Sequence, residues 1–180
     1  NCAITEYSDS KPEILEHVNI ETSTPNESLP KILEFFKSHS IGALGISCFG
    51  PIDLDYDSST YGFITTTPKP GWRDCDFVGY LKKEIDVPIG FDTDVNGAAL
   101  AEIKWGSAKG LKSCLYLTVG TGIGGGAVVE GHLIHGLLHP EMGHILVRRH
   151  EVDDFEGTCP NHGDCLEGLA SGLAIEKRTE

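Results

Sequence analysis

The sequence predicts an α/β protein of two domains, with a boundary near residue 95. The apolar run Ile41–Cys48 is typical of a strand that is covered on both faces. Strand-like and helix-like patterns alternate after this run. A strand pair around a glycine-rich turn at residues 120–125 then opens a second α/β unit. We therefore expect an N-terminal domain over residues 1–95 and a second domain over residues 96–180.

Composition argues against several kinds of partner. The 180 residues are 39% hydrophobic and 23% charged, as is usual for a globular protein. The formal net charge of -13, with no basic run to offset it, argues against nucleic acid and against an anionic membrane surface. No apolar run reaches membrane length and no signal peptide is recognised. Four of the six cysteines stand singly among apolar neighbours, which predicts reduced thiols and a cytoplasmic location. We expect a small-molecule partner.

The first half of the chain begins with a predicted hairpin and a helix. Strand-like segments at residues 2–7 and 14–20 flank a polar turn at residues 8–12, which predicts two antiparallel strands. The next segment has apolar residues at helical spacing: Leu29, Ile32, Leu33 and Phe36. This helix starts either with a capping box at Thr24 or with a later cap at Ser28, and either start buries the same face.

The buried strand leads into a loop and then into a polar excursion. The loop Phe49–Asp53 leaves the carboxyl end of the strand, where ligand contacts are common. Residues 54–74 are rich in Asp, Ser, Thr, Pro and Gly, with a short strand at residues 61–65. The excursion either covers a cleft or forms a plain surface loop.

The alternation of helices and strands continues to residue 129. A second amphipathic helix is marked by three apolar residues: Phe77, Leu81 and Ile85. A strand follows at residues 87–91, and a third helix, rich in Ala, Leu and Glu, at residues 95–107. The run at residues 113–119 and the segment at residues 126–129 then form two strands around the turn at residues 120–125.

The spacing of cysteines and histidines near the end of the chain predicts a metal centre. Cys159, His162 and Cys165 lie three residues apart, and His144 offers a fourth ligand. Two sulfurs and two imidazoles that close a tetrahedron suit structural zinc and leave no position for water. The alternative is a pair of chance thiols or a disulfide, with His162 on the surface. A metal here would hold the neighbouring carboxylates rigidly, as a brace and not as the catalyst.

The glycine-rich turn is a candidate phosphate site. Consecutive N–H groups without side chains can surround an anion, although a plain hairpin turn has the same composition. The segment 120–126 has neither the lysine nor the helix of a Walker loop. A strand also follows where a dinucleotide-binding fold requires a helix.

Asp94 is a candidate catalytic base at the end of a predicted strand. It directly precedes the helix at residues 95–107, so it is either an N-cap or a carboxylate that accepts a proton from a substrate hydroxyl. Asp92 would share its face of the strand. The spacing leaves both interpretations open.

Several segments together resemble one known family. They are Phe49–Asp53, Thr93–Glu102, Thr118–Gly125, Glu141–His144 and the Cys/His cluster that ends at Glu167. In this order they look like the motifs of the ROK family of sugar kinases and repressors, over nearly the whole chain. The Cys-x-x-His-x-x-Cys spacing and the pair Thr93-Asp94 are most similar to zinc-containing bacterial fructokinases. Family glucokinases more often have a Cys-x-Cys loop and an Asn before the Asp.

The resemblance implies an actin-like ATPase (ribonuclease H-like) fold with sugar and ATP between two domains. It implies ATP-dependent phosphorylation of D-fructose to fructose 6-phosphate, with Asp94 as the general base on the 6-hydroxyl. Mg²⁺ would accompany the ATP. The resemblance implies contacts to the ATP phosphates from Thr118, Gly120, Thr121, Gly122, Gly124 and Gly125. It implies sugar contacts from Gly50, Pro51, Asn96, Glu141, His144 and Glu167. It implies Zn²⁺ ligands at His144, Cys159, His162 and Cys165.

The family pattern also implies segments beyond both ends of this sequence. A strand and a glycine-rich phosphate loop are expected just before Asn1, and further helices after Glu180. We therefore expect the fold to be truncated at both ends: residues 1–95 lack the first strand, and residues 96–180 begin the C-terminal domain with its zinc-binding loop.

The same motifs are compatible with other functions. A family glucokinase or mannokinase would share these motifs, and a sugar-sensing ROK regulator would carry an added DNA-binding domain. The intact glycine turn together with Asp94 favours the kinase. A zinc hydrolase is disfavoured because protein atoms fill all four ligand positions. The nucleotide preference and the oligomeric state, a homodimer included, are not fixed by the residues.

Overall fold

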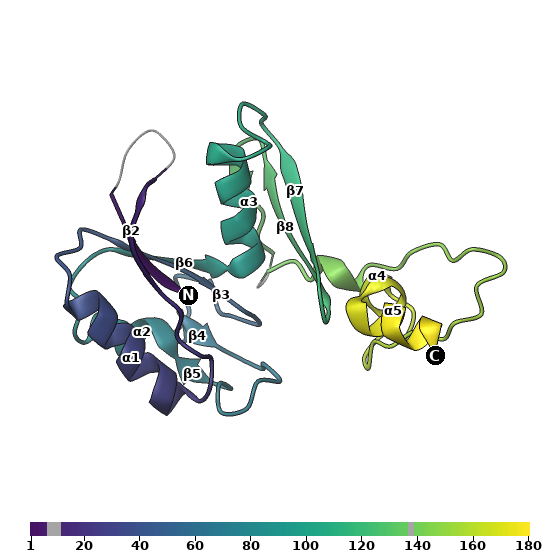
Figure 1. Cartoon of the computed structure of the whole chain (residues 1–180), viewed down its shortest axis with the longest axis horizontal. Helices are drawn as coiled ribbons and strands as arrows, with labels where there is room; N and C mark the ends of the chain where they lie inside the picture. Colours follow the sequence, from purple (N-terminus) through teal and green to yellow (C-terminus); the bar gives the residue numbers. More distant parts are fainter. Residues whose placement is uncertain (7–11, 137–138) are drawn as a thin grey trace. The chain divides into compact units, whose positions relative to one another are not determined.

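The computed structural model describes residues 1–6, 12–136 and 139–180, which divide into two compact units (Figure 1). Unit 1 comprises Asn1–Asp94 together with His139, and unit 2 comprises Val95–Gly136 together with Pro140–Glu180. Both units mix helices and strands, as the α/β prediction requires. Within the described ranges, no helix is long and apolar enough to cross a membrane.

The described residues of unit 1 form three strand pairs. They are β1 (Cys2–Thr5) with β2 (Ile14–Val18), β3 (Leu44–Cys48) with β6 (Ile89–Thr93), and β4 (Phe63–Ile64) with β5 (Cys75–Asp76). The antiparallel pairing of β1 with β2 confirms the predicted hairpin, although residues 8–11 of its predicted turn lie outside the described ranges. β3 and β6 pair in parallel, so the segments that follow them leave the same edge of the sheet.

Helix α1 (Pro25–Lys37) takes the earlier of its two predicted starts. Thr24 is the N-cap, although it makes no side-chain cap bond, and Pro25 occupies a first-turn position that tolerates proline. Ser28, the alternative start, lies buried inside the first turn. Its hydroxyl donates a hydrogen bond of 3.2 Å to the Glu21 carbonyl, which satisfies it there.

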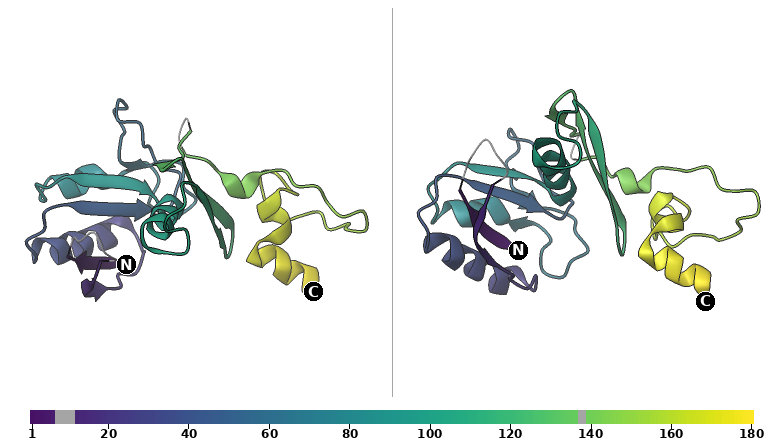
Figure 2. Two further views of the ribbon diagram at one scale, coloured as in Figure 1. Left: turned by 90° about the horizontal axis from the view of Figure 1, so that it is seen from above. Right: turned by 45° about the horizontal axis from the view of Figure 1, so that its top comes forward.

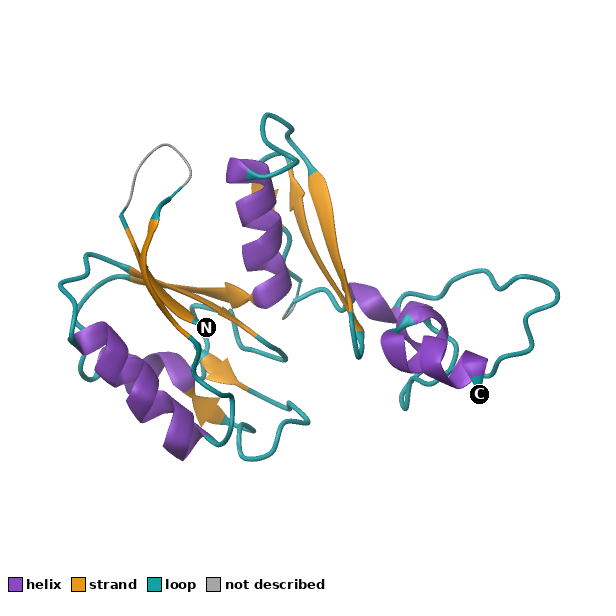
Figure 3. Ribbon diagram, in the orientation of Figure 1, coloured by secondary structure: helices purple, strands orange, loops and turns teal. Residues whose placement is uncertain are grey.

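The core of unit 1 lies between its two helices and one face of β3 and β6 (Figure 3). α2 (Phe77–Lys82) supplies part of it. Its buried apolar residues are Leu29, Leu44, Cys48, Ile52, Ile64, Trp72, Phe77, Val78, Leu81, Ile85 and Phe91. Trp72 belongs to the predicted polar excursion and is buried in this core. Its indole N–H also donates a hydrogen bond of 2.6 Å to the Ser23 carbonyl. The excursion is therefore attached to the core and is not a free surface loop.

The prediction that β3 is covered on both faces is wrong. Leu44 and Cys48 are buried on the core side, whereas Gly45 and Ser47 on the opposite side are exposed. Both exposed residues are small, so this face of β3 has little side chain to bury. The run therefore looks continuously apolar in the sequence although one of its faces is exposed.

Unit 2 is built on a three-stranded antiparallel sheet. Its order is β7 (Cys114–Val119), β8 (Ile123–Val129) and β9 (His132–Leu133). Helix α3 (Asp94–Trp105) precedes the sheet, and the boundary between the units falls after its first residue. A side-chain carbon at Gly126 would collide with the backbone of Val95 and Asn96, so β8 approaches the start of α3 at a distance that only glycine permits.

Three short helices complete the part of unit 2 that the structure describes. They are the 3-10 helix η1 (Met142–His144), α4 (Leu166–Ala170) and α5 (Gly172–Thr179). η1 packs on β8, and α4 contacts η1, β8 and α5. Figure 2 shows α4 and α5 beside each other. The segment that carries the predicted metal ligands is therefore anchored to the same strand as the glycine turn.

Candidate functional site

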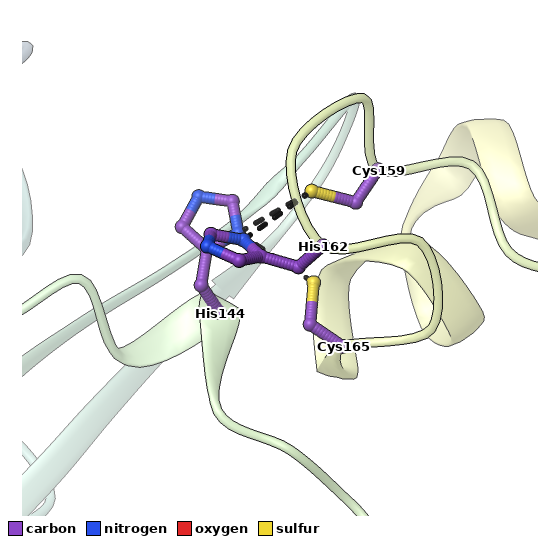
Figure 4. A group of neighbouring side chains, drawn as sticks. All are labelled: His144, Cys159, His162 and Cys165. Carbon is purple, nitrogen blue, oxygen red and sulfur yellow. Dashed lines mark hydrogen bonds between the residues drawn. The ribbon is translucent and has the colours of Figure 1, made fainter.

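The four predicted metal ligands converge in unit 2 (Figure 4). The ligand atoms of His144, Cys159, His162 and Cys165 lie within 4.8 Å of one another. The Cys159 sulfur is 3.7 Å from the Nδ1 atoms of both histidines, and the Cys165 sulfur is 3.5 Å from Nδ1 of His144. A tetrahedral ion with sulfur at about 2.3 Å and nitrogen at about 2.0 Å separates these atoms by about 3.5 Å. The four side chains therefore have the spacing that one metal ion requires.

A tight loop brings these ligands together. Cys159 and Gly163 exchange backbone hydrogen bonds of 3.3 and 2.9 Å, which closes the loop around His162. Gly163 has a φ of 62°, in the left-handed region that favours glycine. Cys165 caps the N-terminus of α4 and is fully buried. Burial raises the pKa of its thiol, so a bound cation would be needed to stabilise the thiolate.

The alternative interpretation of this cluster is not supported. All six cysteines are free thiols, so Cys159 and Cys165 do not form a disulfide. The isolated cysteines are core or half-buried residues: Cys2, Cys48, Cys75 and Cys114. Burial raises the pKa of Cys48 to about 12, so this thiol stays neutral at physiological pH.

The glycine turn is shorter than predicted. β7 ends at Val119 and β8 begins at Ile123, so only residues 120–122 form the turn, closed by a 2.9 Å hydrogen bond from Gly120 N–H to the Gly122 carbonyl. Gly124 and Gly125 lie in β8, so their assignment to the turn is wrong.

Close packing explains the two glycines in the strand. A side-chain carbon at Gly124 would lie 3.1 Å from Val95, and one at Gly125 would lie 2.8 Å from Met142. Thr118 lies in β7 opposite Gly124. The glycines of β8 therefore admit α3 and η1 to the strand, which is a structural reason for them independent of any phosphate.

Asp94 is exposed and stands at the carboxyl end of β6. It is the first residue of α3 and lines a cavity of about 360 Å³ inside unit 1, together with Lys69 and Cys48. The Lys69 ammonium lies 4.6 Å from the centre of the Phe49 ring, so a cation stands beside the loop that follows β3. An accessible carboxylate in a cavity with a nearby cation suits proton transfer, and the position at the start of a helix also suits a cap.

Comparison with known proteins identifies the family. A sequence model of the ROK family matches residues 2–180. The chain belongs to the ROK family. It is 51% identical over 177 residues to the fructokinase of Zymomonas mobilis subsp. mobilis, and 49% identical over 172 residues to the fructokinase of Lactococcus lactis subsp. cremoris. These alignments cover 94% and 95% of this chain.

A solved structure supports the same fold. The ROK hexokinase from Thermus thermophilus superimposes with a TM-score of 0.75 at 28% identity, over 96% of this chain. The predicted actin-like ATPase fold of the ROK sugar kinases is therefore confirmed. The chain spans 59% and 58% of the two fructokinases and 57% of the hexokinase, so it corresponds to somewhat more than half of each relative.

The residues that the ROK resemblance assigns to sugar contacts are divided between the units. Gly50 and Pro51 belong to unit 1. Asn96, Glu141, His144 and Glu167 belong to unit 2. Glu141 is exposed and directly precedes η1, and its backbone carbonyl accepts a hydrogen bond of 3.0 Å from the His144 N–H. Asn96 is only 1% exposed, and its amide donates to the Ile134 carbonyl at 3.2 Å, so it also serves the packing of unit 2.

His139 contacts the Phe49–Asp53 loop, and the sequence prediction missed this contact. A side-chain carbon at Gly50 would lie 2.8 Å from Nε2 of His139, so this ring packs directly on the Phe49–Asp53 loop. His139 is not among the site residues that the ROK resemblance implies. No spacing rule connects His139 with the Gly50–Pro51 loop, because 88 residues separate it from Pro51.

Proposed function

We propose that the complete gene product containing this chain is a fructokinase, which transfers the γ-phosphoryl group of ATP to D-fructose and forms fructose 6-phosphate. The proposal rests on the position of Asp94, whose exposed carboxylate stands at the end of a parallel strand and lines a cavity of unit 1. Identity of 51% and 49% to two fructokinases supports the choice of sugar. Under this proposal Asp94 accepts the proton of the fructose 6-hydroxyl as the oxygen attacks phosphorus.

The glycine turn is the proposed contact for the ATP phosphates. Gly120 and Thr121 of the turn are exposed, and the Gly120 N–H closes the turn, so the N–H groups of Thr121 and Gly122 and the Thr121 hydroxyl are the proposed phosphate donors. Thr118, Gly124 and Gly125 would act from the flanking strands, by shaping the turn. Mg²⁺, when bound with the ATP, supplies positive charge to the transferring group. Phosphoryl transfer depends mainly on such positioning and charge stabilisation.

The metal centre is proposed to hold structural Zn²⁺. Two thiolates and two imidazoles match its ligand preference and fill all four positions, so no activated water is expected. Nδ1 of His144 faces the two sulfurs, which leaves Nε2 for a sugar hydroxyl. Gly50, Pro51, Asn96, Glu141 and Glu167 complete the proposed sugar contacts. The free thiols fit a reducing compartment, and we propose a cytoplasmic location.

A coupled assay of the complete gene product with ATP and a panel of hexoses tests this function. We expect kcat/KM for fructose to exceed the values for glucose and mannose by about tenfold or more, which corresponds to about 1.4 kcal/mol of transition-state discrimination. A preference for glucose or mannose would replace the proposal with a glucokinase or mannokinase. Sugar-dependent DNA binding without turnover of any hexose would replace it with a regulator.

A further inference from the structure

The Glu167 carboxylate makes a direct contact with the glycine turn. Its Oε2 atom accepts a hydrogen bond of 2.8 Å from the backbone N–H of Ile123, the residue that follows the turn. A side-chain carbon at Gly122 would lie 2.5 Å from the same oxygen. The carboxylate therefore lies against the turn, and the absence of a side chain at Gly122 makes this contact possible.

A second contact holds the other end of the turn. The N–H of Gly172, the first residue of α5, donates a hydrogen bond of 2.7 Å to the Gly120 carbonyl. The turn is thus fixed at Gly120 by a backbone group and at Ile123 by a side chain. Only the contact from Glu167 can be removed by a substitution that leaves the backbone intact.

Glu167 is also joined to the metal centre. It follows the ligand Cys165 by two residues, and its Oε1 atom lies 3.9 Å from Nδ1 of His144. The Leu166 N–H donates a hydrogen bond of 2.9 Å to the Ile145 carbonyl, which ties the segment after one ligand to the segment after the other. A shift of these two ligands therefore displaces the first turn of α4 and the carboxylate that it carries.

We propose that Glu167 is a positioning residue that fixes the shape of the glycine turn and transmits the state of the metal centre to ATP binding. This inference rests on the proposed function, in which the turn contacts the ATP phosphates. Because Glu167 engages the Ile123 N–H and the Gly122 carbonyl engages the Gly120 N–H, the phosphate donors would be the N–H groups of Thr121 and Gly122. The role is distinct from a sugar contact, because it affects the nucleotide when no sugar is present.

The test compares Glu167→Ala and Glu167→Gln in the complete gene product, with Glu176→Ala on α5 as the matched control. Glu176 is an exposed glutamate on the neighbouring helix. ATP affinity is measured by calorimetry without sugar. Glu167→Ala should weaken ATP binding about tenfold, the effect of losing one hydrogen bond to a charged group. Glu167→Gln keeps an acceptor oxygen and should restore most of the affinity, and Glu176→Ala should bind ATP as the wild type does.

Two further measurements separate positioning from general damage. Removal of the metal with a chelator should weaken ATP binding by the wild type, but should not weaken that of Glu167→Ala any further. Hydrogen exchange at the Ile123 amide should accelerate in Glu167→Ala. It should accelerate equally in Gly122→Ala, where the added carbon pushes the carboxylate away without changing Glu167 itself.

The outcomes distinguish this inference from the proposed function. Unchanged ATP affinity in a folded Glu167→Ala, or in Gly122→Ala if the first variant does not fold, would overturn the positioning role. ATP binding by the wild type without phosphorylation of any hexose would overturn the kinase and leave the positioning role standing. A wild type that binds no ATP would overturn both, because the turn would then not be a phosphate site.

Discussion

Arg178 holds Asp153 through two parallel hydrogen bonds, Nη1 to Oδ1 and Nη2 to Oδ2, each of 2.8 Å. The same guanidinium lies 4.3 Å from the centre of the Phe155 ring, and its Nε donates a hydrogen bond of 3.1 Å to the Leu169 carbonyl. These contacts attach the loop at residues 145–158 to α5. Bidentate pairs of this kind have more geometric specificity than a single ion pair.

Loss of the Arg178 contacts should loosen this loop. In Arg178→Ala, hydrogen exchange over residues 149–156 and tryptic cleavage after Arg149 should both accelerate several-fold. Arg178→Lys should accelerate exchange and cleavage nearly as much as Arg178→Ala, because an ammonium group cannot form the bidentate pair. Lys177→Ala, at the neighbouring exposed position of α5, is the control and should match the wild type. Unaltered protection of the loop in Arg178→Ala would contradict the anchor.

The anchor should also depend on pH. The hydrogen bonds from Arg178 lower the pKa of Asp153 to about 2. The folded value lies below the ordinary aspartate value of about 3.9, so the stabilisation is complete above that value and is lost as the pH falls toward 2. The difference in exchange between wild type and Arg178→Ala should therefore persist at pH 5 and shrink below pH 3.

A buried aspartate organises the start of the polar excursion in unit 1. Asp53 is 6% exposed. It accepts hydrogen bonds of 3.0 Å from the Asp55 N–H and 2.6 Å from each of the Ser58 and Thr60 hydroxyls. Asp53→Asn should lower the free energy of unfolding by about 2 kcal/mol, since an amide offers one oxygen and cannot accept all three. Urea unfolding measures this, with exposed Asp57→Asn as the control.

The effect of Asp53→Asn should diminish in acid. Burial alone would raise the pKa of Asp53, but the hydrogen bonds from Ser58, Thr60 and the Asp55 N–H outweigh burial and lower it. The carboxylate then stabilises the fold above its unfolded pKa of about 3.9 and loses this effect as the pH falls through the folded value. Equal destabilisation at pH 7 and at pH 3 would show that the charge is not responsible.

The sequence predicted those features whose residues lie close together along the chain. Cys159, His162 and Cys165 lie within one tight loop, so their convergence followed from sequence spacing and ligand chemistry. The first hairpin likewise followed from a polar turn between two strand-like segments. The sequence predicted the strands that became β3 and β6 but not their parallel pairing. His144 lies in η1, outside that loop, so it was predicted as the fourth ligand from its residue type and not from its spacing.

Features that depend on distant packing could not be predicted in the same way. Gly124 and Gly125 look like turn residues, and only the approach of Val95 and Met142 shows that they are strand residues. The contact between Glu167 and Ile123 joins positions 44 residues apart, and no spacing rule connects them. The contact on which the proposed positioning role of Glu167 depends could therefore be seen only in the three-dimensional structure.

One tightly bound zinc ion per chain is expected, and Cys165→Ala should remove it. Structural zinc contributes on the order of 10 kcal/mol to the folding of small metal-dependent motifs, so residues 145–167 should lose their protection from hydrogen exchange. Elemental analysis of protein purified without chelators measures the metal. Cys114→Ala, a half-buried cysteine on β7, should retain full zinc. Wild-type protein without zinc, or a Cys165→Ala variant with stoichiometric zinc, would refute the metal centre.

The last prediction separates the two interpretations of Asp94. In the complete gene product, Asp94→Asn and Asp94→Ser keep a side chain that can cap α3 but remove the ability to accept a proton. If Asp94 is the base, kcat should fall about a hundredfold or more in both variants, while fructose affinity stays close to that of the wild type. If it is only a cap, both variants should turn over normally and Asp94→Ala should lose stability by about 1 kcal/mol.

Asp86→Asn, at an exposed position before β6, controls for the loss of one surface charge and should leave kcat unchanged. Steady-state kinetics with saturating ATP, together with thermal unfolding of each variant, decides between them, and near-normal turnover in Asp94→Asn would remove Asp94 from the chemistry.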